Sequence, residues 1–596
     1  MRTAKTKRPI FGKVDEATRQ EEKVVHKGGF ANFFGMYKGV RIPWLLFILA
    51  LCYNIFSSYV LESRTGADTQ IAAGNFEDIS VIAVWAGLYL LYYICSFGEL
   101  FGSFANYRLI SRVSGRLWDK ILHLPLSYYD RQPPGRLVSR VTSDTSIATA
   151  PFSLVLGLAS LGSLLTFALN SMGKMNPTMT KWYIVSNVVL AAYMLLVARI
   201  HRKVGIVVNN RLSKFTSYLS ERLSNFRLIK ASGSEDEELD EALGLIDLRF
   251  RGQLYYVFAH ALNLLGNTLA NCVLVVVAFG IGGVLLNQGE IKSGSILYSF
   301  YLYGGMISLC IYMVFYYIVD VGDMLGRSEK FAAVFKEESE DIHAGGHIDV
   351  QDQDITLEDV TFQYDEGVPV LENISCTIPK GKVTAIVGAN GSGKTTLIKI
   401  LDRLYPAGGS IRFGGIDAST VALKDWRSMF GVVTQSANLF SGTLRDNICY
   451  GIDRRVPDEE LKKVARLAHI EDLVASLPDG FDSDVGPDGS GLSGGEQQRV
   501  AIARAMIKNP EYLLLDEATA NLDARTEAAV KEGLDELMSG RTTVMIAHSL
   551  SAIRGADHVI VMENGRVVGS GTHEELMKNC DYYRTFVKVQ SIEEAV

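Results

Sequence analysis

Residues 388–395 read GANGSGKT, and residues 492–499 read LSGGEQQR. The first stretch fits the pattern G-x-x-x-x-G-K-[ST], in which backbone N–H groups surround phosphates and a lysine neutralises their charge. Taken alone, it could also be a glycine-rich turn between a strand and a helix. Here, however, LSGGEQQR and then the apolar strand Tyr512–Leu515, which runs into Asp516-Glu517, come later in the chain. Together these features predict an α/β domain that binds a nucleoside triphosphate.

The order of these motifs resembles that of the ATP-binding cassette (ABC) ATPases. The resemblance implies that residues 388–395 form the phosphate-binding loop, or P-loop, and that its ligand is ATP. It also implies an aromatic residue that stacks on the adenine ring. Ile355–Tyr364 alternates apolar and polar residues, so we expect an antiparallel strand that ends at this aromatic residue. The residues expected to bind ATP in this way are Tyr364, Gly388, Asn390, Gly391, Ser392, Gly393, Lys394, Thr395 and Thr396.

The resemblance also implies a catalytic set and a magnesium ion. Asp516 and Thr395 would hold Mg²⁺, together with Gln435 of the segment GVVTQSANLFSGT. Glu517 would act as general base on the attacking water, and His548 in VMIAHSL would bridge the γ-phosphate and that water.

The second glycine-rich stretch carries the cassette signature. Ser493, Gly494 and Gly495 are expected to open a helix, where free N–H groups favour an anion. In the family this signature meets the ATP bound by the opposite subunit. Asp523 lies in the segment that matches the family's D-loop, and it is a further residue expected to bind ATP. The resemblance therefore implies a dimer with composite sites, and the intact motifs favour a homodimer.

Composition separates the chain into two halves and excludes some functions. The chain has 596 residues, 48% hydrophobic, and long apolar runs occur only before about residue 325. A formal net charge of −7 without a basic stripe in the second half argues against nucleic acid as a partner. Seven scattered cysteines without a C-x-x-C pair argue against a disulfide framework or a zinc site.

Six segments of the first half are long and apolar enough to cross a membrane. They lie near 42–62, 80–106, 151–172, 182–200, 255–286 and 295–319. The loops 108–150 and 199–251 are rich in arginine and lysine, whereas 64–79, 173–181 and 287–294 are short and hold few basic residues. By the positive-inside rule, both long loops, both termini and the ATPase are cytoplasmic. We expect a multi-pass protein of a bacterial cytoplasmic (inner) membrane.

These features predict a six-helix membrane domain followed by an α/β P-loop domain. We expect a cytoplasmic N-terminus at 1–41, a six-helix membrane domain at 42–325, a linker at 326–349 and the ATPase at 350–596. The aromatic residues between 30 and 37 are compatible with an interfacial elbow helix or with the start of the first spanning helix.

The cytoplasmic loops resemble those of exporter-type half-transporters. Residues 127–145, SYYDRQPPGRLVSRVTSDT, look like the first cytoplasmic loop of multidrug and peptide exporters, where Tyr-Tyr-Asp-Arg precedes a transverse coupling helix. Residues 221–239 look like the segment after the second coupling helix. The resemblance implies a domain-swapped exporter dimer. One departure concerns coupling, because Ser483–Gly489 reads SDVGPDG where exporters commonly read TEVGERG.

Polar and aromatic residues inside the spans are candidates for substrate contact. His260, Asn263 and Asn267 recur at three-to-four spacing, so they line a cavity or hold helices together. Glu99 either attracts a cation or lies at the membrane interface, and Tyr312 belongs to an aromatic wall that also suits helix packing.

We therefore expect ATP-driven export of hydrophobic or amphipathic substrates, namely drug-like compounds, lipids or mature peptides, by a homodimer that contacts membrane lipids. The alternative is an ATP-gated channel or a regulatory ABC protein that pumps no substrate. ATP-dependent transport into vesicles separates the two.

Overall fold

The computed structural model describes residues 35, 37–74, 78–132, 134–142, 144–291, 293–347, 353–364, 367–516, 524–547 and 549–593. It divides into two compact units. We call residues 1–122 with 134–337 the helical unit, and residues 123–133 with 338–596 the sheet unit. Residues 123–133 thus belong with the sheet unit, although they lie in the sequence between two segments of the helical unit.

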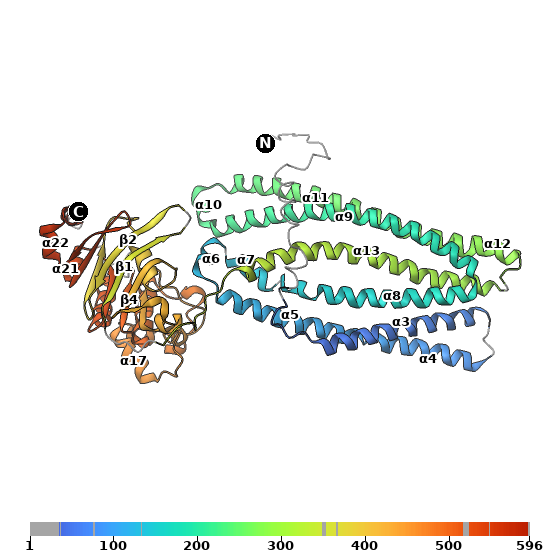
Figure 1. Cartoon of the computed structure of the whole chain (residues 1–596), viewed down its shortest axis with the longest axis horizontal. Helices are drawn as coiled ribbons and strands as arrows, with labels where there is room; N and C mark the ends of the chain where they lie inside the picture. Colours follow the sequence, from blue (N-terminus) through green and yellow to red (C-terminus); the bar gives the residue numbers. More distant parts are fainter. Residues whose placement is uncertain are drawn as a thin grey trace. The chain divides into compact units, whose positions relative to one another are not determined.

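The helical unit is built from long helices that run side by side (Figure 1). Its helical segments are α3 (Trp44–Ala72), α4 (Ile79–Ser96), α5 (Glu99–Leu122), α7 (Pro134–Thr142), η1 (Asp144–Thr149), α8 (Ala150–Met175), α9 (Pro177–Ser224), α10 (Phe226–Ser232), α11 (Glu235–Val275), η2 (Val276–Ile281), α12 (Gly282–Asn287) and α13 (Gly294–Lys336). Within the described residues, six helical stretches are long and apolar enough to cross a membrane. The prediction of six spans is confirmed.

Among the described residues, three helices, α9, α13 and α11, have more than 40 residues and exceed the thickness of a membrane. α9 has 48 residues and α11 has 41, which correspond to about 72 Å and 62 Å at 1.5 Å per residue. α9 starts where Pro177 occupies its first turn and the Asn176 side chain accepts the backbone N–H of Met179. The short α10, whose left-handed cap is Gly233, connects α9 to α11. The hairpin therefore extends well beyond a hydrocarbon core of about 30 Å.

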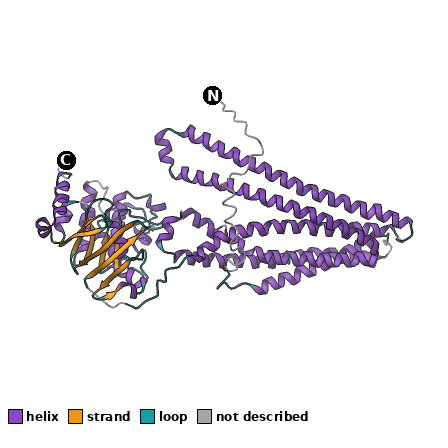
Figure 2. Cartoon of the chain, turned by 45° about the horizontal axis from the view of Figure 1, so that its top comes forward, coloured by secondary structure: helices purple, strands orange, loops and turns teal. Residues whose placement is uncertain are grey.

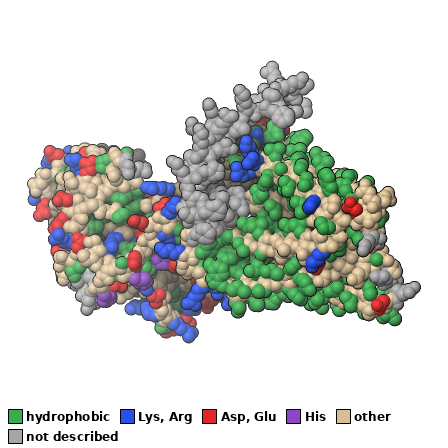
Figure 3. Space-filling view, turned by 45° about the vertical axis from the view of Figure 1, so that its right-hand side comes forward, with side chains coloured by type: hydrophobic (Ala, Val, Ile, Leu, Met, Phe, Trp, Pro, Cys, Tyr) green, Lys and Arg blue, Asp and Glu red, His purple; other side chains and the backbone are tan. Residues whose placement is uncertain are grey.

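Small residues let these helices approach closely. A Cβ atom on Gly266 of α11 would lie 2.5 Å from the Tyr193 ring of α9, and one on Gly304 of α13 would lie 2.2 Å from Leu274. Large apolar side chains cover much of the outer surface instead, as Figure 3 shows for one face. This distribution is expected where lipid surrounds a bundle.

The second predicted span, 80–106, is not one continuous helix. α4 ends at Ser96 and α5 begins at Glu99. At the junction the Tyr53 ring fills the space beside Gly98, since a Cβ atom there would lie 1.7 Å from Tyr53 Cδ1. α13 in turn continues to Lys336, into the range 326–349 that the sequence assigned to the linker.

The sheet unit contains two sheets (Figure 2). The four-stranded antiparallel sheet has the order β2-β1-β4-β5, and the six-stranded sheet has the order β10-β9-β3-β8-β7-β6, with every neighbouring pair parallel except β10 and β9. The strands are β1 (Ile355–Gln363), β2 (Pro369–Ile378), β3 (Val383–Val387), β4 (Gly408–Phe413), β5 (Ile416–Asp417), β6 (Phe430–Val433), β7 (Tyr512–Leu515), β8 (Thr542–Ile546), β9 (His558–Glu563) and β10 (Arg566–Gly571). The predicted α/β domain is confirmed.

Helices surround these sheets. They are α6 (Leu126–Arg131), α14 (Lys394–Leu401), η3 (Ala418–Thr420), α15 (Leu423–Met429), α16 (Leu444–Ile448), α17 (Asp458–Leu467), α18 (Glu471–Ser476), η4 (Gly480–Asp482), η5 (Pro487–Gly489), α19 (Gly494–Lys508), α20 (Ala524–Met538), α21 (Leu550–Gly555), α22 (His573–Asn579) and α23 (Asp581–Glu593). Between the sheets, the buried rings of Phe413, Trp426, Phe430 and Tyr512 pack edge-on or tilted. This aromatic core fixes α14 and α15 against the strands.

α6 packs on the ATPase fold. Leu126 contacts the core between the sheets, and the Tyr405 hydroxyl donates a hydrogen bond to Asp130. The residues Tyr128–Arg131 lie within this short helix. From the sequence we expected them to precede a transverse coupling helix, and α7 (Pro134–Thr142) is the helix that follows them in the chain.

Candidate nucleotide-binding site

Parallel strands bring the phosphate-binding loop and two polar side chains to one sheet edge. The P-loop follows β3, Gln435 follows β6, and Asp516 follows β7 directly. β6 and β7 are paired neighbours, and the Asp516 N–H donates to the Val433 carbonyl at 2.9 Å. Carboxyl ends of parallel strands meet at the same edge, where ligands of α/β folds bind.

The P-loop needs glycine at two positions, because at each one φ is positive and a neighbouring atom lies too close for a Cβ atom. Gly388 has φ 154°, and a Cβ atom on it would lie 2.2 Å from the Met562 carbonyl oxygen. Gly393 has φ 99°, and a Cβ atom there would lie 2.7 Å from Leu371. Gly393 also precedes α14 without a side-chain cap, so the positive end of that helix faces the loop.

Lys394 is buried and lies over the loop that it should serve. Its Nζ donates to the carbonyl oxygens of Gly388 at 2.8 Å and Ala389 at 3.1 Å. Beside it, the Ser392 hydroxyl is buried without a hydrogen-bond partner. A buried orphan hydroxyl is costly, and a phosphate oxygen would satisfy it. The loop therefore has the donors of a phosphate site.

Two hard oxygen donors lie together beside the loop. The Thr395 hydroxyl donates to Asp516 at 3.4 Å. A hydroxyl and a carboxylate are the ligands that Mg²⁺ prefers in phosphate sites. These residues thus fit a magnesium ion. Gln435 is exposed beyond the end of β6.

Tyr364 directly follows β1, which ends at Gln363, one residue before the end that the alternating pattern predicts. Its ring is 38% exposed and packs edge-on against Phe362 and Tyr405, at centroid distances of 4.8 Å and 5.3 Å. The Tyr364 hydroxyl lies 3.3 Å from the hydroxyl of Thr396 in α14. The ring is thereby oriented beside the P-loop helix with part of its surface open for stacking.

The signature segment forms the start of α19. Ser493 caps the helix, and a capping box joins it to Glu496, whose carboxylate accepts from the Ser493 N–H at 2.8 Å and from the hydroxyl at 2.7 Å. Ser493 and Gly494 are exposed, whereas Gly495 is buried. Sequence reasoning missed Gln498, which is buried and donates to the Thr434 carbonyl at 3.2 Å. Because Thr434 directly precedes Gln435, this hydrogen bond connects the signature helix α19 to the segment that carries Gln435.

Three predicted site residues, Glu517, Asp523 and His548, lie outside the described residues. Their neighbours in the chain are placed, because Asp516 ends one side of the first gap and Ala547 follows β8. The Ala547 N–H donates to the Ile386 carbonyl at 3.2 Å, beside the strand that enters the P-loop.

The candidate substrate residues of the helical unit have different surroundings. Asn263 is 1% exposed and its Oδ1 has no hydrogen-bond partner, whereas His260 is exposed and Asn267 half-buried. Tyr312 contacts Tyr316, with the two hydroxyls 2.8 Å apart. Glu99 lies exposed in the first turn of α5 rather than in the middle of a helix.

Sequence reasoning also missed His201 on α9. It is 6% exposed, and its ring packs edge-on against Tyr256 of α11 at 4.6 Å and Phe315 of α13 at 5.8 Å. Its Nδ1 is buried without a partner. Nothing in the sequence pattern marked this residue, because its neighbours come from two other helices.

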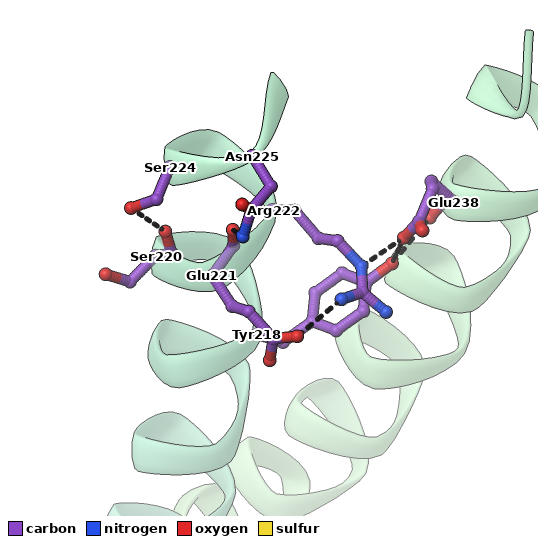
Figure 4. A network of polar contacts seen from close by, with 7 residues as sticks. All are labelled: Tyr218, Ser220, Glu221, Arg222, Ser224, Asn225 and Glu238. Atoms are coloured by element: carbon purple, nitrogen blue, oxygen red, sulfur yellow. Dashed lines mark hydrogen bonds and ion pairs between the residues drawn. The ribbon is translucent and has the colours of Figure 1, made fainter. Parts of the chain in front are cut away.

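A polar network closes the hairpin of α9, α10 and α11 (Figure 4). Arg222 Nε lies 2.6 Å from Glu238 Oε2, and the Tyr218 hydroxyl donates to the same carboxylate. The Arg222 guanidinium also lies over the Tyr218 ring at 4.9 Å. The network joins the ends of α9 and α11 on either side of α10.

Known proteins share both units. The sequence matches the ABC transporter family over residues 371–520 and the ABC transporter transmembrane region over residues 42–308. It is 30% identical to the multidrug resistance ABC transporter ATP-binding and permease protein of Lactococcus lactis subsp. cremoris, over 96% of this chain and 98% of that protein. It is 30% identical to the ATP-dependent lipid A-core flippase of Pseudoalteromonas translucida, over 94% of this chain and 97% of that protein. A solved bacterial Atm1-family ABC exporter with ATP bound matches with a TM-score of 0.77 at 25% identity, covering 91% of this chain and 97% of that one.

Proposed function

We propose that this chain, which belongs to the ABC transporter family as an exporter-type half-transporter, pairs with a second copy to export amphipathic or hydrophobic substrates. It is a multi-pass integral membrane protein that hydrolyses ATP for export. We further infer its membrane, the roles of its catalytic residues, its pairing and its substrate class.

The membrane is the cytoplasmic membrane of a bacterium, with the ATPase and both termini inside the cell. The basic residues that carry this assignment lie in loops 108–150 and 199–251. The long α9–α11 hairpin carries the second loop beyond the bilayer.

ATP is bound by the P-loop, with Lys394 turning from the loop carbonyls to the β/γ-phosphates. Thr395 and Asp516 hold Mg²⁺, with Gln435 at the adjacent strand end. The ion supplies charge neutralisation on the phosphate oxygens when it is bound. Glu517 accepts a proton from the attacking water, and His548 orients that water against the γ-phosphate.

The ATP sites are shared between the two copies. Ser493 and Gly494 are exposed at the positive end of α19, and they are supported from behind by the Glu496 capping box. An ATP molecule on the P-loop of one copy would meet this helix terminus of the other copy. Because the chain carries both motifs, a homodimer would have two equivalent sites.

The substrate class rests on one observation, two of the buried polar atoms without partners inside the bundle. His201 Nδ1 and Asn263 Oδ1 are both buried without partners, and aromatic rings of α11 and α13 lie beside His201. A sugar or a free amino acid needs many hydrogen-bonding partners, and the aromatic rings beside His201 would not replace the hydration that such a substrate loses. A substrate with a large apolar body and one or two hydrogen-bonding groups fits these surroundings.

The test is ATPase stimulation of the full chain in lipid nanodiscs, with amphipathic cations, lipids and mature peptides as separate probes. We expect stimulation by at least one of these classes and ATP-dependent uptake of the same compound into inverted vesicles. Stimulation confined to small hydrophilic solutes would exclude this substrate class. Stimulation without uptake would favour the channel or regulatory alternative.

A further inference from the structure

The linker between the two halves of the chain forms an ion pair with the ATPase fold. Glu340 binds the Arg427 guanidinium through both carboxylate oxygens, with Nη1–Oε2 at 3.2 Å and Nη2–Oε1 at 3.3 Å. Both side chains are half-buried, with exposed fractions of 21% and 30%. A two-pronged pair of this kind is directional and is less screened than an exposed one.

The same linker residue contacts the segment that leads into α6. The Glu340 N–H donates to the His123 carbonyl at 2.7 Å. His123 follows α5 directly in the chain, and Glu340 follows α13. Two of the three points at which the chain passes between the units, 122/123 and 337/338, therefore lie close in sequence to this hydrogen bond.

Backbone contacts fix the register of the linker on α15. The Lys424 N–H donates to the Ile342 carbonyl at 2.9 Å, and Gly346 exchanges hydrogen bonds with Thr420 and Ala422 at 2.8 Å and 3.0 Å. At Gly345, a Cβ atom would lie 2.5 Å from the Ala422 nitrogen. The linker is thus hydrogen-bonded to, and in close contact with, the backbone of residues 420–424, which fixes its position along that segment.

Arg427 reaches the far ends of the two helices that carry the nucleotide motifs. Its Nη2 donates at 2.9 Å to the carbonyl of Arg403, just past the end of the P-loop helix α14. Its own carbonyl accepts from Nζ of Lys508 at 2.8 Å, in the last turn of the signature helix α19. Arg427 is therefore hydrogen-bonded to groups at both helix ends.

The Arg427 guanidinium is not fully hydrogen-bonded in this arrangement. Arg427 Nε is buried without a partner, which leaves a donor unsatisfied. The carboxylate of Asp402, at the end of α14, lies within electrostatic reach of both Arg427 and Lys508. Asp402 is thus a second carboxylate that competes with Glu340 for the Arg427 guanidinium.

We propose that the Glu340–Arg427 pair is a transmission contact, through which the ends of α14 and α19 report the nucleotide state to the linker and to the chain before α6. When ATP brings a signature helix against the opposite P-loop, α19 moves relative to α14, and Arg427 carries that displacement to Glu340. Glu340 and Arg427 are positioning residues, since neither contacts ATP. The proposal rests on ATP-driven export as the function of the chain.

The loop before the signature explains why this chain would use such a contact. Exporters commonly carry Glu-Arg in that loop, and this chain carries Pro487-Asp488 there. Asp488 has a left-handed backbone with φ 52° inside η5. The charged pair of that loop is thus absent from the sequence, and an ion pair on the linker supplies another charged connection.

The test uses the full chain in nanodiscs with Glu340→Gln, which keeps the side-chain shape and removes the charge. Glu340→Asp retains the charge, and Glu372→Gln is the matched control because Glu372, with a half-buried side chain, pairs with Arg566 in the same unit. We expect basal ATPase activity within about twofold of wild type for all three variants. We expect coupling to fall roughly fivefold or more only for Glu340→Gln, the lower end of typical coupling between sites.

Coupling is read in two ways. One is substrate-stimulated ATPase activity, and the other is the change in hydrogen exchange in connections 173–181 and 287–294 when ATP and vanadate are added. The second readout needs no substrate, so it tests the contact even if no transported compound is found and the proposed function fails. A wild-type change in hydrogen exchange that Glu340→Gln retains would overturn the proposal. Equal losses of basal activity, thermal stability and coupling would mark the pair as structural only and would also overturn it, as would a wild-type protein with no change.

Discussion

The hydroxyl of Thr395 lies 3.4 Å from a carboxylate oxygen of Asp516, although 121 positions separate the two residues in the chain. The contact joins the start of α14 to the residue that follows β7. The P-loop and the Asp516 carboxylate therefore lie next to each other. We expect Asp516→Asn to lower the apparent affinity for Mg²⁺ in ATP hydrolysis by about tenfold or more. Titration of activity against Mg²⁺ measures this, with Glu511→Gln, at the opposite end of β7, as control. An unchanged Mg²⁺ dependence would remove Asp516 from the magnesium site.

Glu517→Gln should abolish turnover and leave ATP binding intact. The amide keeps the shape of the side chain but cannot accept the proton of the attacking water. The variant should also retain ATP in the closed dimer, because hydrolysis normally reopens it. Nucleotide occupancy after gel filtration, measured beside phosphate release, checks both points. Hydrolysis near the wild-type rate would show that another group is the base.

Shared sites predict complementation between damaged copies. A dimer of one Lys394→Ala copy and one Ser493→Arg copy contains one site with both defects and one site with neither. Mixing the two variants during reconstitution should therefore recover part of the hydrolysis that each variant lacks alone. If no mixture recovers activity while crosslinking shows mixed dimers, then the sites are not shared or cannot work singly.

The buried amide of Asn263 predicts a substrate-dependent defect. Asn263→Leu removes the orphan acceptor Oδ1 and should change ATPase stimulation by an amphipathic compound about fivefold, with basal hydrolysis retained. Asn271→Leu is the matched control, because Asn271 lies on the same helix with its side chain exposed. Tyr312→Ala should resemble Asn263→Leu. Equal responses of Asn263→Leu and Asn271→Leu would exclude a specific role for Asn263.

Asp402 predicts a pH-dependent effect on stability. Burial raises the pKa of Asp402 from 3.8 to about 6, even though Arg427 and Lys508 act to lower it. The folded protein therefore binds this proton more tightly than the unfolded chain does. The resulting stabilisation is complete below pH 3.8 and is lost as pH rises through about 6.

Asp402→Asn should consequently be more stable than wild type at pH 8, by at most about 3 kcal/mol, and by only about half as much at pH 5. Thermal unfolding of the full chain in detergent at both values of pH measures the difference. A loss of stability that is equal at pH 5 and pH 8 would mean that the carboxylate contributes contacts rather than an ionisation cost.

Several features of this protein were predictable from the sequence because they depend on local pattern. GANGSGKT binds phosphate through its own backbone and its own lysine, so neighbouring residues are enough to recognise it. Long apolar runs specify spanning helices because a bilayer requires about twenty apolar residues in succession. The alternation of Ile355–Tyr364 likewise specified a strand with an aromatic residue at its end.

Other features were decided only by tertiary structure. The break before Glu99 depends on the Tyr53 ring beside Gly98, and the burial of His201 depends on rings from α11 and α13. The attachment of α6 to the ATPase fold depends on Tyr405, which lies far away in the chain. Likewise, no pattern around Glu340 or Arg427 indicates that they pair. Such contacts join residues that lie far apart in the chain, so no local sequence pattern reveals them. They stabilise the protein only once folding has brought the two residues together.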